Sequence, residues 1–264
     1  MEENNHICET GYFIKNNFLN HQQIENLKSE IFYLENKFIF NGNSVGTVWF
    51  NKNYYDVYNP ITNINSLNLL ETSVDIAKLI FKNKYLDYRL TNLRISVEKY
   101  NAYPLDWHSD IVNHTVRAII YLDKVGDNNG SLSIISGSHL NKSNNINHKV
   151  NLTKEDLNKK RNLNCDAGDI LCFDPNIIHK KNPVLEIRRT IMLEFQQQKS
   201  SSNKYIILID NSKLTKKTLE SFQLFNSANG TSKFELNVYS KKTSYHTPFI
   251  IFLKILFNRL FKKN

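Results

Sequence analysis

Apolar residues recur along the chain in short runs that predict a protein built mainly of β-strands. The runs at 116–122, 169–178 and 188–195 are rich in β-branched and aromatic residues, which favour strands. Residues 7–40 predict a strand followed by an amphipathic helix that begins near Asn20, and helical spacing returns at 67–83. Many short strands with a few flanking helices predict a double-stranded β-helix, a cupin-like jelly-roll barrel.

Other segments depart from this pattern. The Asn-, Gly- and Tyr-rich stretch at 41–66 is either part of a substrate mouth or a surface loop. The lysine-rich stretch at 141–164 is long for a connection in a compact core, so it is either a lid or a flexible insertion. A strand is expected at 205–209 and a helix at 214–225. The predicted domains are a jelly roll at 1–198, an extension packed on the barrel at 199–246, and a basic amphipathic helix at 247–264.

The tail at 248–264 places its cationic side chains on one side of a helix and Phe, Ile and Leu on the other. It is too short and too charged to span a bilayer, which needs about 20 apolar residues. Such a helix can lie in the interface of an anionic membrane, or it can dock on the protein's own body or on a second subunit. The expected location is cytoplasmic, with any peripheral contact at the inner face of a membrane. The oligomeric state stays open.

Composition favours a soluble intracellular protein with one large core. A chain of 264 residues can form a single domain, and its polar, acidic N-terminus predicts no secretory signal. Cys8, Cys165 and Cys172 form an odd set without metal-binding spacing, which predicts reduced thiols. The net charge of +9 comes with no zinc finger, helix-turn-helix or aromatic–basic motif, so no specific nucleic-acid partner is expected.

His108-Ser109-Asp110, with His179 far downstream, is the constellation that indicates a chemistry. Residues two apart in an extended strand point to the same side, so His108 and Asp110 can face one point. His179 from a distant strand would complete a 2-His-1-carboxylate facial triad, which holds Fe(II) and leaves positions open for substrate and O2. Taken alone the pair could be a surface turn, but strand-like runs surround it. His114 either touches substrate or metal or is a surface histidine.

Further motifs accompany this constellation in order along the chain. They are Gly11-Tyr12-Phe13-Ile14, Asn129-Gly130-Ser131-Leu132, Ser136-Gly137-Ser138-His139 and Ala167-Gly168-Asp169. Together they resemble, over roughly residues 10–196, the phytanoyl-CoA dioxygenase family of Fe(II)- and 2-oxoglutarate-dependent oxygenases. Ser136 stands where the family usually has Pro. The resemblance implies a jelly-roll dioxygenase in which His108, Asp110 and His179 bind Fe(II) and His139 is structural.

The resemblance also places the arginine that binds the cosubstrate at Arg188. A guanidinium can bind the distal carboxylate of 2-oxoglutarate in a bidentate pair. Thr190 shares a strand face with Arg188 and can add a hydroxyl, whereas Arg189 lies on the other face and remains the alternative. Further candidates for the site surround these residues. One of Glu98, Lys99, Tyr100 and Tyr103 is expected to line the cosubstrate site, while Arg94, Arg117 and Tyr121 are either inward strand positions or surface residues.

The expected reaction uses Fe(II), 2-oxoglutarate and O2 to hydroxylate a small-molecule or lipid or glycolipid substrate, with release of succinate and CO2. Asp110 favours hydroxylation over halogenation, because halogenating relatives lack this carboxylate. Glu194 stands where the nucleic-acid demethylase branch has a second arginine, which argues against base repair. Two alternatives are a catalytically silent jelly roll that acts as a binding module and a membrane-recruited scaffold whose tail is the functional part.

Overall fold

The computed structural model describes residues 3–34, 47–51, 54–58, 64–82, 87–100, 106–110, 112, 114–140, 150–197, 208–210, 217, 220–221 and 237–239. The helices are α1 (Glu3–Thr10), α2 (His21–Leu34), α3 (Ile64–Phe81), the 3-10 helix η3 (Ser138–Leu140) and α4 (Lys154–Asn158). The strands are β1 (Tyr12–Lys15), β2 (Thr47–Asn51), β3 (Tyr54–Tyr58), β4 (Tyr88–Glu98), β5 (Thr115–Tyr121), β6 (Leu132–Ile135), β7 (Lys160–Leu163), β8 (Ile170–Phe173), β9 (His179–Lys181), β10 (Arg188–Gln197), β11 (Leu208–Asp210) and β12 (Asn237–Tyr239).

Most strands belong to two antiparallel sheets. A seven-stranded sheet has the order β1-β8-β5-β10-β4-β3-β2, and a three-stranded sheet has the order β7-β6-β9. A separate parallel pair joins β11 and β12. In the large sheet β10 lies between β4 and β5, so that Thr190 pairs with Ser96 on one side and with Tyr121 on the other. Because facing residues of paired strands lie on the same side of a sheet, this register decides which side chains meet.

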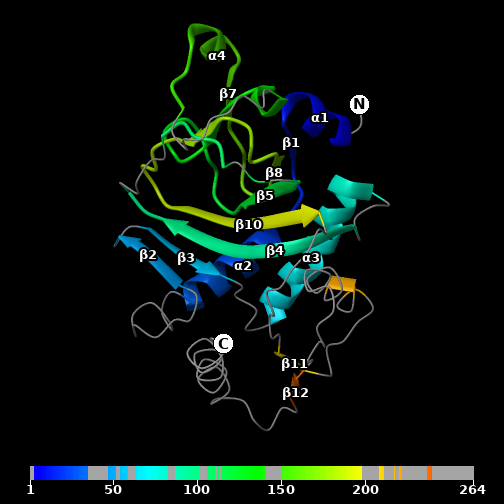
Figure 1. Ribbon diagram of the computed structural model, residues 1–264. Coiled ribbons are helices and arrows are strands. Elements are labelled where there is room, and N and C mark those ends of the chain that lie inside the picture. Colours follow the sequence, from blue (N-terminus) through cyan, green and yellow to red (C-terminus); the bar gives the residue numbers. More distant parts are fainter. Residues whose placement is uncertain are drawn as a thin grey trace, which may run out of the picture.

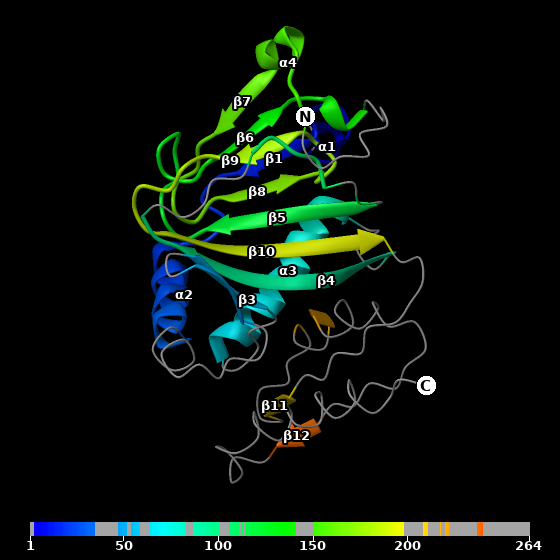
Figure 2. The same ribbon diagram turned by 60° about the vertical axis from the view of Figure 1, so that its left-hand side comes forward.

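Two hydrophobic cores lie on opposite faces of the large sheet. On its outer face, Ile191, Leu193 and Phe195 of β10 pack with buried side chains of α2 and α3. Figures 1 and 2 show these two helices against the large sheet, with the small sheet and α4 at the other end of the molecule. On its inner face, Ile119 and Met192 share a core with residues of the small sheet. Two sheets enclosing an inner core form the predicted double-stranded β-helix.

The predicted helix start near Asn20 is confirmed by the structure. The side chain of Asn20 accepts a hydrogen bond from the Gln23 backbone N–H, and the Gln23 side chain accepts one from the Asn20 backbone N–H. This reciprocal capping box satisfies backbone donors that have no partner within the helix. The second predicted helix, at 67–83, is found as α3.

Two local expectations were correct only in part. The strand predicted before α2 is found as β1, but it begins at Tyr12 because residues 3–10 form α1, and α1 ends at Gly11, whose φ of +89° is the left-handed conformation that stops helices. The run at 169–178 is not one strand. The strand β8 ends at Phe173, because the carboxylate of Asp174 accepts a hydrogen bond from the backbone N–H of Asn176 and so forms a turn before β9.

Several expectations lie wholly or partly outside the described residues. The amphipathic helix at 248–264 is wholly outside them. The described part of the 141–164 stretch contains α4 and β7, and a capping box at Thr153 begins α4. All three cysteines have free thiols, as predicted. In the part of the chain that is described, no helix is long and apolar enough to cross a membrane.

Candidate metal centre and cosubstrate site

His108, Asp110 and His179 lie together between the two sheets. Their potential ligand atoms are all within 4.8 Å of one another. The Nε2 atoms of His108 and His179 are each 3.7 Å from a different oxygen of Asp110. Metal bonds from imidazole nitrogen and carboxylate oxygen are about 2.0–2.2 Å long, so donor atoms around one ion lie about 3–4 Å apart. The three side chains therefore fit a single ion without rearrangement of the backbone.

Backbone hydrogen bonds bring the two histidines side by side. His108 and His179 form an isolated antiparallel bridge in which each backbone N–H donates to the other's carbonyl oxygen over 2.9 Å. His108 was expected within a strand, and this bridge replaces it, but the two-residue alternation still holds. The hydroxyl of Ser109 donates to the carbonyl oxygen of Asn176. The Ser109 side chain thus points to the 174–178 turn, whereas the side chains of its neighbours His108 and Asp110 point to the potential metal site.

Each histidine presents its Nε2 atom to the centre of the group. The Nδ1 atom of His108 is 2.6 Å from the carbonyl oxygen of Asp106, and that of His179 is 2.7 Å from the carbonyl oxygen of Ile177. Because a carbonyl oxygen only accepts, each Nδ1 carries a proton, and in the neutral ring the lone pair is then on Nε2. Burial, together with the nearby His108, lowers the pKa of His179 to about 4. His179 is therefore neutral at pH 7, as a metal ligand must be.

Arg117 connects the inner face of the large sheet to the three potential metal ligands, His108, Asp110 and His179, which we call the metal group. Its Nη1 atom donates to Oδ2 of Asp110, and its Nε atom donates to Oε2 of Glu194 over 2.9 Å. Arg117 of β5 and Glu194 of β10 are direct partners in the strand register, so their side chains share the inner face. The sequence had left Arg117 open as an inward or a surface residue, and the structure places it inward beside Asp110.

Arg188 lies at the buried end of the same face. Its guanidinium forms an ion pair with Glu98 of β4, its direct partner in the register, and Lys181 of β9 forms a second ion pair with the same carboxylate. All three side chains are at most 7% exposed. Burial alone would raise the pKa of Glu98, but the charges of Arg188 and Lys181 outweigh it and hold the pKa below its ordinary value. Glu98 is thus ionised inside the protein.

Three neighbours complete the surroundings of Arg188. Its guanidinium carbon lies 5.6 Å from the ring centroid of Tyr121, and burial raises the pKa of the Tyr121 hydroxyl, so that this group stays protonated. Thr190 is buried two residues along β10 on the same face. Gly130 has a φ of +70°, and a Cβ atom added there would lie 2.3 Å from the Arg188 Cδ atom. The glycine leaves the space that the arginine side chain fills.

The structure separates the remaining candidates from this cluster. Arg189 forms an ion pair with Asp123 at 2.9 Å and belongs to the outer side of the strand, and His114 is exposed. His139 approaches the carbonyl oxygen of Cys8 at 3.2 Å, which agrees with a structural role. Of the four candidates between residues 98 and 103, Glu98 contacts Arg188. Lys99 and Tyr100 are exposed, and Tyr103 lies outside the described residues.

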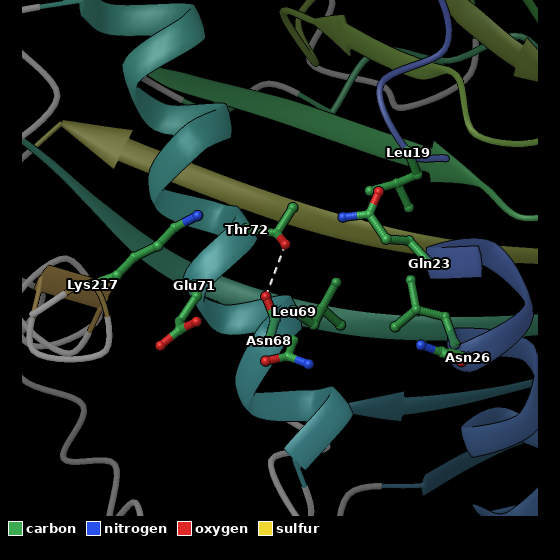
Figure 3. A pocket seen from close by; sticks show the side chains of 9 residues that line it. Leu19, Gln23, Asn26, Asn68, Leu69, Glu71, Thr72 and Lys217 are labelled. Atoms are coloured by element: carbon green, nitrogen blue, oxygen red, sulfur yellow. Dashed lines mark hydrogen bonds between the residues drawn. The ribbon is translucent and has the colours of Figure 1, made fainter. Parts of the chain in front are cut away.

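A cavity of about 220 Å³ lies elsewhere, between α2 and α3. Figure 3 shows Gln23 and Asn26 of α2 facing Asn68 and Thr72 of α3 across it. The Leu69 side chain that lines it belongs to the core on the outer face of the large sheet. This cavity is therefore separated by the sheet from the group around Asp110.

Solved structures share the fold. AviO1 from Streptomyces viridochromogenes Tue57 has a TM-score of 0.59 and 20% identity, covering 76% of this chain and 96% of its own. The epimerase SnoN in complex with Fe³⁺, α-ketoglutarate and nogalamycin RO has a TM-score of 0.58 and 17% identity, covering 74% and 82%. HygX from Streptomyces hygroscopicus, with nickel, 2-oxoglutarate and hygromycin B bound, has a TM-score of 0.53 and 12% identity, covering 77% and 88%. The predicted jelly-roll fold is confirmed.

A search of curated proteins found no significant match to this sequence. The family profile described as phytanoyl-CoA dioxygenase (PhyH), in contrast, matches residues 7–184, more than half of the 264 residues. The predicted cofactors, iron and 2-oxoglutarate, agree with this match. The chain belongs to the phytanoyl-CoA dioxygenase (PhyH) family of iron- and 2-oxoglutarate-dependent oxygenases.

Proposed function

We propose that the protein hydroxylates a small-molecule substrate, with His108, Asp110 and His179 holding Fe(II) and with Arg188 and Thr190 binding 2-oxoglutarate. The observation that carries the proposal is the meeting of two imidazoles and one carboxylate, with donor atoms within 4.8 Å of one another. Two histidines and one carboxylate with open positions are the ligand set of non-haem Fe(II) oxygenases. Such a centre, when loaded, couples oxidative decarboxylation of 2-oxoglutarate to succinate and CO2 with oxidation of a bound substrate.

The chain's own residues fit this role in their hydrogen bonding. Both Nδ1 protons are directed to backbone carbonyl oxygens, which fixes the tautomer that leaves Nε2 for an ion. Arg117 bonds one oxygen of Asp110, so the other oxygen remains for the ion. One carboxylate oxygen and two imidazole nitrogens would hold the ion from one side and would leave its other positions to 2-oxoglutarate and O2.

Charge supports binding of the distal carboxylate of 2-oxoglutarate at the buried end of the inner face. Arg188 and Lys181 both lie there, and both are paired with the single carboxylate of Glu98. A guanidinium in a buried site forms strong, directional hydrogen bonds with a second carboxylate. Thr190 adds a hydroxyl on the same face. Arg189, the alternative in the sequence, is instead paired with Asp123.

The test is substrate-independent decarboxylation of 2-oxoglutarate, followed as succinate formation with Fe(II) under air. We expect His108→Ala, Asp110→Ala and His179→Ala each to lower it at least a hundred-fold and to abolish the weak visible absorption band of the anaerobic complex with Fe(II) and 2-oxoglutarate. Arg188→Met should raise the KM for 2-oxoglutarate at least ten-fold. The matched variant Arg189→Met, on the other face of the same strand, should leave this KM within about two-fold.

These outcomes also separate the alternatives. Folded wild-type protein that gives no absorption band with Fe(II) and 2-oxoglutarate would support a catalytically silent binding module. An increase of the KM for 2-oxoglutarate in Arg189→Met but not in Arg188→Met would show that Arg189, and not Arg188, binds the cosubstrate. Retention of the band in all three variants of the triad would remove the proposed metal site.

A further inference from the structure

Four polar side chains continue from the metal group across the inner face of the large sheet. We call them the polar strip: Arg117 of β5, Glu194 of β10, and Asn92 and Arg94 of β4. The strand register places Glu194 directly between Arg117 and Asn92, and Arg94 opposite Met192. Contacts agree with the register, because Arg117 donates to Glu194 and the Nη2 atom of Arg94 is 3.2 Å from the sulfur of Met192.

The polar strip begins at the metal group itself. Arg117 donates hydrogen bonds to both Asp110 and Glu194, so only the Arg117 side chain lies between Glu194 and a proposed iron ligand. Facing residues on neighbouring strands have Cβ atoms about 4.5–5.5 Å apart, so Asn92 is the next side chain along the same row. A small molecule held close to the iron on this side therefore contacts the strip.

The strip is polar and more exposed than the apolar positions of the inner face. Interior positions of small barrels are normally filled by packed side chains, and here Ile119, Leu171 and Phe173 fill that role and are buried. All four strip residues are only half-buried. Half-buried polar side chains beside a proposed metal site, on a face where these apolar positions are closed, mark the side of the centre that admits a polar molecule.

The hydrogen-bonding groups of the strip match hydroxyl groups better than alkyl chains. Glu194 supplies acceptors, Arg94 and Arg117 supply donors, and the amide of Asn92 supplies both. The Oδ1 atom of Asn92 is buried and accepts no hydrogen bond from the described residues. An aliphatic chain laid on these groups would remove them from water without replacing their hydrogen bonds, which is unfavourable.

The charges near the centre favour a neutral partner over an anion. The strip and its contact at Asp110 contain two guanidinium groups, from Arg94 and Arg117, and two carboxylates, from Asp110 and Glu194. A site for a highly charged anion would need an excess of cationic groups. A balanced set of donors and acceptors suits a hydroxyl group, which both donates and accepts.

We propose that the substrate is a neutral, polyhydroxylated small molecule whose hydroxyl groups hydrogen-bond to Glu194 and Asn92 beside the iron, and that it is not an aliphatic lipid. This inference rests on the proposed function, because it takes the group around Asp110 as the place of reaction. Glu194 and Asn92 hold the substrate, while Arg117 anchors Glu194 in place and keeps it next to the metal group.

The test uses full-length protein with Fe(II), 2-oxoglutarate and O2, and follows succinate. The probes are the two phases of a chloroform–methanol–water extract of the cells that encode the protein. We expect the aqueous phase to stimulate succinate formation at least five-fold over the substrate-independent rate. Cleavage of vicinal diols with periodate, followed by quenching, should remove the stimulation, whereas an aqueous phase taken through the same steps without periodate should keep it. The chloroform phase should give none.

Variants connect this stimulation to the strip. Asn92→Leu should lower the ratio of stimulated to substrate-independent succinate formation at least ten-fold, and the ratio corrects for any change in the basal rate. Asn26→Leu makes the same substitution at an exposed position of α2 and should keep the wild-type ratio. Glu194→Gln should also lower the ratio.

Several results would overturn the inference. They are stimulation by the chloroform phase alone, aqueous stimulation that survives periodate, no stimulation by the aqueous phase, or an unchanged ratio in Asn92→Leu. A failure of the proposed function would be distinguishable from these results. In that case the wild-type protein would give neither the absorption band with Fe(II) and 2-oxoglutarate nor substrate-independent succinate.

Discussion

The position of the Arg188 side chain depends on the absence of a side chain at residue 130. Gly130 combines a φ of +70° with a close approach to Arg188, and its backbone N–H donates to the carbonyl oxygen of Pro183 over 2.8 Å. A left-handed φ is unfavourable for residues with a Cβ atom. An added Cβ would also lie 2.9 Å from both Nε of Arg188 and Cγ2 of Val184. The glycine therefore serves both the turn and the arginine.

Gly130→Ala should displace Arg188 and strain the turn. We expect the free energy of unfolding to fall by about 1–3 kcal/mol, because strained backbone and overpacking each cost amounts of this order. The KM for 2-oxoglutarate should rise at least five-fold. Gly126→Ala is the matched control, since an added Cβ there meets no atom within 4 Å. Urea denaturation and succinate kinetics measure both effects, and equal behaviour of the two variants would contradict this account of Gly130.

Individual site residues differed in how far the sequence could predict them. His108, Asp110 and His179 were predicted from their order and spacing, and Arg188 from the resemblance to the family; the structure brings the potential ligand atoms of the first three within 4.8 Å of one another. Glu98 was only one of four candidates, because pairing with Arg188 depends on a strand register that a single sequence does not contain. The contact between Arg117 and Glu194 was missed for the same reason.

At the scale of elements, β10 serves both cores with its two faces. Its inner face carries Arg188, Thr190 and Glu194, whereas Leu193 on its outer face is fully buried against the core that α2 and α3 share. Alternation along the strand predicted this division. The end of α1 at Gly11 was not predicted, because a short helix of low apolar content resembles an irregular segment in a single sequence.

Leu193→Ala should destabilise the protein through the outer core. Truncating a buried leucine loses transfer free energy and leaves a cavity, so we expect a loss of about 2–5 kcal/mol in urea unfolding. Leu185→Ala removes the same atoms at a position that is 46% exposed, and it should change stability by about 0.5 kcal/mol or less. Similar losses in the two variants would mean that the outer core is not packed as described.

At the scale of the whole molecule, a cluster of buried charges lies between the two sheets, where Glu98 of the large sheet meets Lys181 of the small one. Removing one member of a buried ion pair leaves the others without compensation, which typically costs about 3–5 kcal/mol. Lys181 and Arg188 both depend on Glu98. The carboxylate therefore joins the two sheets electrostatically while it prepares the proposed cosubstrate site.

The pH dependence of stability follows from the direction of the Glu98 shift. Burial opposes ionisation, but Arg188 and Lys181 hold the pKa in the folded protein below the ordinary value of 4.5. The unfolded chain then binds a proton more readily than the folded one, so the contribution of Glu98 to stability is complete above about pH 4.5 and is lost as pH falls through the lowered pKa.

Glu98→Gln has no such proton to bind. We expect it to be about 3–5 kcal/mol less stable than wild type at pH 7, with the difference shrinking below pH 4.5. Urea unfolding at a series of pH values measures this, with Glu186→Gln at an exposed position as the control that should follow wild type at pH 7. A difference between wild type and Glu98→Gln that stays constant from pH 7 to the acid limit of folding would show that the carboxylate charge does not stabilise this buried group.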